Sequence, residues 1–285
     1  MANNTIVYKE DWAVALQARL NEPNKWKEVC NVEYTDGKVL HNPYLTDPTV
    51  QTGLRGTPYA FQAAVETDEY ITIDTFYILP QVMDRADIAQ SGYLKQMEMA
   101  DRQAVLLNES IETMFLGDYA NLTTFDASTL SGGSGSITVS ASNIDDIVRG
   151  LQQQILTANG GAVLDRNGAF IIWRPADFNL LAAFAQANGF TTADQGLKNG
   201  IGAGFSGFDY MGFTHYTSNK LTAGHVIAGV KKLYHIGICK STYGQIMVDE
   251  KDPNLISGVS VVSRVDAKGK AWNKTKPLLF NVVVA

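Results

Sequence analysis

Residues 78–87 read Ile78-Leu79-Pro80-Gln81-Val82-Met83-Asp84-Arg85-Ala86-Asp87, and they join a predicted strand to a predicted helix. The strand covers residues 70–79, where apolar and polar residues alternate as on a half-buried sheet, and we expect Pro80 to end it. The helix covers about residues 86–116 and stops at Gly117. Its apolar face repeats at spacings of three and four through Leu94, Met97, Ala100, Ala104, Leu107, Ile111 and Met114.

The predicted helix is unusually long. About thirty residues at roughly 1.5 Å each give a rod of about 45 Å, whereas the mean helix of a globular protein has about 11–12 residues. Its apolar stripe is short and drifts around the helix, which favours a helix lying across a sheet over a coiled coil.

Upstream of the strand, residues 35–67 have almost no periodicity. A turn signal, Asp36-Gly37, and several prolines and glycines interrupt them. A loop of this length is uncommon inside a compact domain. We therefore expect either a surface loop or an extended arm that becomes ordered against another molecule. Residues 11–20 before it predict a short helix.

Downstream, a Gly/Ser-rich connection at residues 131–136 separates the long helix from an α/β part. Ser142 and Asp145 predict a capping box for a helix that ends near Gly160. A buried strand at residues 169–173 and a helix that begins at Pro175 follow.

The C-terminal third predicts short strands after a Gly-rich loop at residues 196–212. The strands cover residues 212–216, 225–229 and 235–239. The end of the chain predicts a hairpin, in which strands at residues 256–265 and 277–284 flank a turn at residues 267–270.

Composition limits the possible functions. The 285 residues carry a net charge of −6, which disfavours a protein that grips a nucleic-acid backbone. Charged residues make up 18%, against roughly 25% in an average soluble protein. Such a neutral polar surface can be buried against copies of itself at little desolvation cost. The N-terminus is unlike a secretory signal, and no apolar run approaches the roughly 18 residues of a membrane span.

Signatures of catalysis or metal binding are missing from the sequence. The two cysteines are far apart, which disfavours a disulfide framework and a zinc site and fits free thiols inside a cell. His41, His215, His225 and His235 follow no metal-ligand spacing. The GxGxxG match at residues 202–207 lacks the strand before it and the helix after it that dinucleotide binding requires. We therefore expect no enzyme, cofactor or metal.

The order of these features resembles the major capsid protein of tailed bacteriophages, the Hong Kong 97-type fold. The resemblance rests on the run at residues 78–87 and on the helix end Leu116-Gly117-Asp118. It also rests on Ala169-Phe170-Ile171-Ile172-Trp173-Arg174-Pro175-Ala176-Asp177 and on Met211-Gly212-Phe213-Thr214-His215-Tyr216-Thr217-Ser218. Each motif is weakly specific alone, and their order carries the resemblance.

The resemblance implies an α+β fold with a long spine helix on a β-sheet. By position, it implies an N-terminal arm at 1–34, an extended loop at 35–69 and a peripheral domain at 70–141. An axial α/β domain at 142–249 and C-terminal strands that return to the peripheral domain at 250–285 complete it. The extended loop would lie over a neighbouring subunit, and we expect Lys38, Arg55 and Tyr59 at inter-subunit contacts. We do not transfer the Lys–Asn cross-link of some members, because Lys38 lies near the start of the loop.

The implied function is structural. The chain would assemble in the host bacterial cytoplasm into hexamers and pentamers of a virion shell around double-stranded DNA, without sequence-specific binding and without a membrane. Portal, scaffolding and decoration proteins would be its other partners. Two alternatives remain open at this point: an encapsulin-like bacterial compartment shell, and a cytosolic α/β enzyme or ligand-binding protein.

Overall fold

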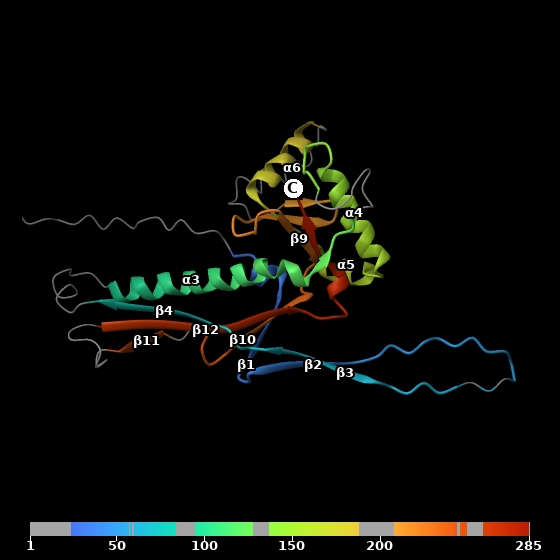
Figure 1. Cartoon of the computed structure of the whole chain (residues 1–285), viewed down its shortest axis with the longest axis horizontal. Helices are drawn as coiled ribbons and strands as arrows, with labels where there is room; N and C mark the ends of the chain where they lie inside the picture. The colour runs from blue at the N-terminus through green and yellow to red at the C-terminus, as the bar shows by residue number, and fades with distance from the viewer. Residues whose placement is uncertain are drawn as a thin grey trace, which may run out of the picture.

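The computed structural model describes residues 24–56, 58, 60–83, 95–127, 137–187, 208–243, 246–249 and 259–284. Figure 1 shows an elongated layer of one helix on a sheet, a more compact α/β part above one end, and a long hairpin that projects beyond the sheet. The helix predicted at residues 11–20, the connection at 131–136 and most of the Gly-rich loop at 196–212 lie outside the described residues.

The elongated layer is built on a five-stranded sheet. The long strand β12 (Val259–Ala271) pairs antiparallel with β4 (Phe76–Met83), β10 (Tyr234–Cys239) and β11 (Ile246–Asp249). Strand β1 (Asn31–Thr35) adds to β10 in parallel. Strands far apart in the sequence therefore share one sheet.

One helix, α3 (Lys95–Gly117), lies along β4 and β12 (Figure 1). The predicted end at Gly117 is confirmed, and the predicted part before Lys95 is outside the described ranges. The predicted stripe is only partly right, because Ala104 is exposed and the buried row is Gln103, Leu107, Ile111 and Phe115.

The polar member of that row is held by a buried hydrogen-bond network. The Gln103 Nε2 donates to the Val261 carbonyl and to the Gln81 Oε1, both at 3.1 Å, and the Ser263 hydroxyl donates to the Gln103 Oε1 at 2.5 Å. A buried amide is tolerated because its partners satisfy it. The helix is therefore joined to both β4 and β12 at this point.

The prediction that Pro80 ends the strand is wrong. Strand β4 continues through Pro80, which lies opposite Val262 of β12. Among the described strands β4 pairs only with β12, so it is an edge strand, where a proline without an N–H is tolerated. The break lies earlier, at residues 73–75, between β4 and β3 (Glu66–Thr72).

A six-stranded sheet forms the compact part, in the order β5-β13-β9-β6-β8-β7. The strands are β5 (Thr123–Thr124), β13 (Leu279–Val283), β9 (His225–Val230), β6 (Ala169–Trp173), β8 (Phe213–Thr217) and β7 (Phe208–Tyr210). The helices are α4 (Ile144–Thr157), α5 (Gly161–Asn167) and α6 (Pro175–Ala187). The predicted buried strand at 169–173, the helix start at Pro175 and the three short strands are confirmed.

Two details of this part differ from the sequence prediction: the N-cap of α4 and the presence of α5. The apolar face of α4 is fully buried as predicted, but the capping box is wrong, because Asn143 is the N-cap and Asp145 binds elsewhere. The short helix α5 was not predicted. It follows directly after Gly160, whose missing side chain leaves room for Leu278 and Ile155.

The predicted C-terminal hairpin is also wrong. Strand β12 runs straight through residues 267–270, because these residues pair with β10. Strand β13 joins the other sheet, where it pairs with β9 and β5. A short 3₁₀ helix, η3 (Lys276–Leu278), precedes it. The C-terminal strands are thus divided between the two sheets and do not return together to the first.

Gly269 lies within residues 267–270, the predicted turn, and close packing explains the glycine at this position. A Cβ at this position would lie 2.5 Å from the Tyr234 Oη and 2.6 Å from its Cε1. The Tyr234 ring is buried, contacts Phe115 at 5.0 Å between centroids, and donates its hydroxyl hydrogen to Asp118 at 2.7 Å. Here a glycine marks close packing and not a turn.

We expect Gly269→Ala to lower the free energy of unfolding by about 1–3 kcal/mol, because the anchored ring must move to admit the methyl group. Urea unfolding measures the change. Gly117→Ala is the matched control, since nothing lies within 4 Å of a Cβ there. Equal stability of the two variants would contradict this explanation of Gly269.

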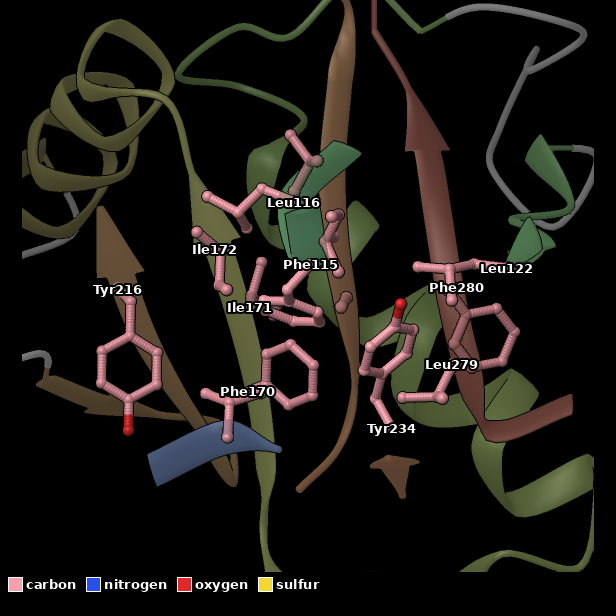
Figure 2. Close-up of a cluster of buried hydrophobic side chains, with 14 of the residues drawn as sticks. Phe115, Leu116, Leu122, Phe170, Ile171, Ile172, Tyr216, Tyr234, Leu279 and Phe280 are labelled. Atoms are coloured by element: carbon pink, nitrogen blue, oxygen red, sulfur yellow. The ribbon is translucent and has the colours of Figure 1, made fainter. Parts of the chain in front are cut away.

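A continuous apolar core joins the two sheets. Figure 2 shows Phe115 and Leu116, from the end of α3, next to Phe170 and Ile171 of β6, with Tyr234 and Phe280 from β10 and β13 nearby. The short helix α1 (Trp26–Val29) also belongs to this core, since Trp26 and Val29 are fully buried. The two parts are therefore packed on one another.

Candidate assembly interface

The projecting hairpin (residues 39–72) is the most unusual surface of the chain. Strand β2 (Val39–Leu45) pairs antiparallel with β3 from Val39↔Thr72 to Leu45↔Glu66. One further backbone bond runs from the Thr46 N–H to the Val65 carbonyl at 2.9 Å. The prediction of a loop at residues 35–67 is therefore wrong at both ends, and Figure 1 shows the remainder extending far from the sheet.

Two glutamine side chains hold the outer arms of the hairpin together. The Gln62 amide accepts from the Thr49 N–H at 2.8 Å and donates to the Thr49 carbonyl at 2.9 Å. The Gln51 amide makes the same pair of bonds with Ala60, at 3.3 and 2.9 Å. Each side-chain amide thus takes the place of a pair of backbone hydrogen bonds between the arms, which are not β-strands at these positions.

Large apolar side chains along the hairpin are exposed. Val50 is 92% exposed, Leu54 is 82% exposed and Phe61 is 89% exposed. A projecting two-stranded hairpin has no core of its own in which to bury them. Exposed apolar groups gathered on a projection indicate an interaction surface. This surface can be covered by a second molecule.

The base of the hairpin is fixed to the five-stranded sheet. The buried Glu69 carboxylate accepts from the Asn273 N–H at 3.0 Å, and the Lys270 Nζ donates to the Tyr70 carbonyl at 3.2 Å. The Lys274 Nζ lies 3.0 Å from the Asp47 carboxylate and donates to the Leu45 carbonyl at 3.3 Å. Lys270 at the end of β12, and Asn273 and Lys274 just after it, therefore set the direction in which the hairpin points.

A second exposed apolar row lies on β4. Because side chains alternate along a strand, Tyr77, Leu79 and Gln81 face α3, whereas the opposite face carries Phe76, Ile78, Pro80 and Val82, all of which are exposed. No described helix covers that opposite face (Figure 1). The chain thus has an apolar hairpin and an uncovered apolar sheet face.

The predicted contact residues are not brought together. Lys38 and Arg55 are both exposed, Lys38 at the base of the hairpin and Arg55 near its far end. Tyr59 lies outside the described residues. Sequence reasoning missed Gln51 and Gln62 and the exposed row on β4. The apolar residues at positions 76, 78 and 82 are the signal for that row, because the solvent face of a half-buried strand is expected to be polar.

Lys38 also borders a pocket of about 400 Å³ at the hairpin base, together with Asp74, Cys239, Arg264 and Asp266. Three of the charged groups in it, Asp74, Arg264 and Asp266, are already paired. Arg264 binds Asp266 through two hydrogen bonds of 2.6 and 2.9 Å, and Lys268 lies 3.4 Å from Asp74. A hydrogen bond from Thr75 and the Lys268 ammonium lower the pKa of Asp74. The pocket therefore resembles a surface ion-pair network more than a catalytic site.

The four histidines occupy separate structural positions. His41 pairs with Asp68 at 2.6 Å, His225 bonds Asn281, His235 lies beside Glu33, and His215 is buried against Trp173. Within the described ranges, no three His, Cys, Asp or Glu side chains are grouped to hold a metal ion. The same part of the chain contains no helix with the length and apolar character needed to cross a membrane.

The chain matches known proteins in structure but not in sequence. No protein-family model and no curated protein matches the sequence. A solved chain of Mycobacterium phage Che8 matches with a TM-score of 0.70 and 17% identity, over 98% of each chain. The mature capsid of bacteriophage PhiM1 matches at 0.66 and 12% identity, over 98% of this chain and 92% of the other. The capsid of an empty GTA particle matches at 0.65 and 13% identity, over 100% and 98%.

These matches establish the fold. They run over nearly the whole of both chains, so the likeness concerns the overall fold of the chain and not one part of it. The expected mixed α/β fold of capsid chains is therefore confirmed, while identities of 12–17% carry no residue-level function.

Proposed function

We propose that this chain is the major capsid protein of a tailed double-stranded DNA phage and forms the icosahedral head shell. One observation carries the proposal: the fold matches chains from the capsid of a phage and the capsid of a GTA particle almost from end to end. A match over nearly the whole of both chains is more than the likeness of a single α/β domain.

The exposed apolar surfaces support the same function. In the proposed shell, the hairpin at residues 39–72 is the extended loop and lies on a neighbouring subunit. Val50, Leu54 and Phe61 would then be buried between subunits, where apolar area stabilises association. Lys38, Arg55 and Tyr59 would lie at or near the same contact. The low content of charged residues, 18%, favours such burial because few charges must be desolvated.

The two sheets support a revised division into domains. We propose α3 as the spine helix, the five-stranded sheet as the core of the peripheral domain, and the six-stranded sheet with α4, α5 and α6 as the axial domain. The boundaries that the sequence resemblance implies, 70–141, 142–249 and 250–285, would change in this division, because β10 and β11 lie with β12, and β13 lies with β9. The N-terminal arm expected at 1–34 would not include α1 and most of β1, since these are part of the core and the sheet, and its residues 1–23 lie outside the described residues.

The proposed partners follow from the shell. The chain would bind copies of itself in hexamers and pentamers, and it would contact a portal and separate scaffolding or decoration proteins at particular places. It would enclose double-stranded DNA without reading its sequence, in keeping with a net charge of −6. The proposed location is the virion, after assembly in the bacterial cytoplasm.

Electron microscopy and size-exclusion chromatography of the recombinant full-length chain test this function. We expect shells, or ring-shaped capsomers, far larger than the 31.1 kDa subunit. A chain that stays a 31.1 kDa monomer at high concentration and binds a small molecule would overturn the proposal. If particles form in cells, nuclease-protected DNA inside them supports a phage shell, and enclosed protein cargo supports a compartment shell instead.

A further inference from the structure

His215 is buried in the six-stranded sheet at a position that the shell function does not use. It lies in β8, opposite Phe208 of β7 and next to Ile171 of β6. Its side chain is fully buried. Strands β7 and β8 form a hairpin at the open edge of the described sheet, where β7 pairs only with β8. Edge elements of this kind open at lower cost than central strands.

Both ring nitrogens of His215 have partners, and these partners select one protonation state. The Trp173 Nε1–H donates to the His215 Nδ1 at 2.9 Å, so this nitrogen must be an acceptor. The Nε2 lies 3.2 Å from the Tyr210 carbonyl oxygen, which can only accept, so this nitrogen must carry the hydrogen. The indole and imidazole planes differ by only 4° and their centroids are 6.2 Å apart, which is compatible with a hydrogen bond in the plane of the imidazole ring. The site therefore fits the neutral ring with its hydrogen on Nε2.

A second proton cannot be accommodated without movement. It would bind at Nδ1 and point at the Trp173 N–H, so two donors would face each other in a buried site. The indole hydrogen would lose its acceptor, and a positive charge would be buried. The imidazole therefore has to leave Trp173 when it is protonated.

We propose that His215 is an acid-sensitive latch, which holds the β7–β8 hairpin against β6 while it is neutral and releases this edge of the sheet when it is protonated. The proposal does not depend on the shell function. It concerns the hairpin that ends in the turn Met211-Gly212, where both residues have left-handed backbone angles, with φ of 51° and 78°.

The charged groups around the latch do not offset the buried charge. On β7, Asp209 raises the pKa of His215, but its carboxylate accepts the Thr214 hydroxyl at 2.7 Å. From α4, Asp145 accepts the Tyr210 hydroxyl at 2.8 Å and is paired with Arg149 at 2.5 Å. Burial and the bond to Asp145 raise the pKa of Tyr210 to about 12, so this phenol stays neutral. On β6 the facing group is the Trp173 N–H, which cannot accept a hydrogen.

The pH range of the latch follows from linkage. Burial lowers the pKa of His215 to about 4, from an ordinary value of about 6.5 once the hairpin has opened. The open form therefore binds protons more readily than the closed form. The closed form is fully stable above about pH 6.5, and opening increases as the pH falls from about 6.5 to 4, by up to about tenfold per unit and about 300-fold in total.

Hydrogen exchange of the unassembled full-length chain between pH 4 and 8 tests the latch. After correction for intrinsic exchange rates, we expect amides of β7 and β8 to open more often as the pH falls, while amides of β13, near the other end of the same sheet, do not follow them. His215→Gln is the matched variant, because its amide can donate and accept but does not titrate. We expect its β7–β8 exchange to be independent of pH over this range.

Ring-proton NMR of the wild-type chain gives a second readout that does not require the variant to fold. His215 should titrate near pH 4, and Trp173→Phe, which removes the opposing donor, should move that titration upward. The proposal is overturned if His215 titrates near 6.5 in the folded chain. It is equally overturned if β13 opens with the same pH dependence as β7 and β8, or if His215→Gln leaves that dependence unchanged.

Discussion

Replacing residues 47–64 by Asn-Gly should abolish assembly and leave the subunit folded. Thr46 and Val65 already form a hydrogen-bonded pair, so a two-residue Asn-Gly turn can close the hairpin directly after them. At the base of the hairpin the bonds of Glu69 to Asn273 and of Lys270 to Tyr70 are kept, and only the exposed contact between Lys274 and Asp47 is lost. We therefore expect the free energy of unfolding of the subunit to change by no more than about 1 kcal/mol.

The loss of assembly should be large because the removed segment carries Val50, Leu54 and Phe61. Full burial of each such side chain contributes about 1.5–3 kcal/mol. Every 1.4 kcal/mol is a tenfold change in an association constant. Losing all three contacts at one subunit boundary should weaken that contact by more than about 1,000-fold, and the effect is repeated at every copy of the boundary in a shell.

Light scattering and electron microscopy of the purified variant measure assembly, and urea unfolding measures subunit stability. A full-length variant with Val50→Ser, Leu54→Ser and Phe61→Ser should fail in the same way, which separates apolar contact from hairpin length. Thr52→Ala, an exposed neighbour on the same arm, is the matched control and should assemble normally. Normal shells from the shortened chain would show that the hairpin is dispensable for the proposed assembly.

Trp26→Ala should lower the free energy of unfolding by about 3–5 kcal/mol, the usual cost of truncating a fully buried aromatic side chain. Trp26 begins α1 and packs in the core shared by the two sheets. The backbone around it is also bound in place. The Glu112 Oε2 accepts from the Lys25 and Trp26 N–H groups at 3.0 and 2.7 Å. The cavity left by alanine therefore cannot collapse easily.

Urea unfolding of the subunit again provides the measurement, with Lys27→Ala as the control from the same turn of helix. The Lys27 side chain is exposed, and its carbonyl, which accepts from the Lys232 Nζ at 2.7 Å, is unaffected by the substitution. We expect the control to change stability by less than about 0.5–1 kcal/mol. A Trp26→Ala variant as stable as Lys27→Ala would mean that this segment is a detachable arm, as the sequence suggested for residues 1–34.

Strong local patterns predicted their elements well. The five apolar residues on one face of α4, the continuous apolar strand β6 and the proline at the start of α6 each depend on neighbours within a few positions. Burial of one face or both faces of an element leaves a periodic record in the sequence. For this reason the order of elements was sufficient to indicate the capsid-chain architecture that the solved structures share with this chain.

The candidate interface was only partly predictable. The lack of periodicity in residues 35–67 indicated either a surface loop or an extended arm. The Gln51 and Gln62 bonds depend on which arm lies opposite, and the sequence does not state that register. Likewise, Phe76, Ile78 and Val82 are exposed because α3 covers only one face of the sheet. A strand that is apolar on both faces looks buried until the covering layers are known.

The sequence alone was therefore enough for the longer helices α3, α4 and α6, for several of the strands, for the order of these elements, and for the absence of recognisable catalytic motifs, because these depend on residues close together in the chain. Tertiary structure decided how the strands were shared between sheets. In the folded chain β12 continues through the apparent turn at Gly269, because Tyr234 packs there, and β13 pairs with strands of the second sheet. Those choices depend on contacts between residues far apart in sequence, whose pairing free energy outweighs the local turn preference.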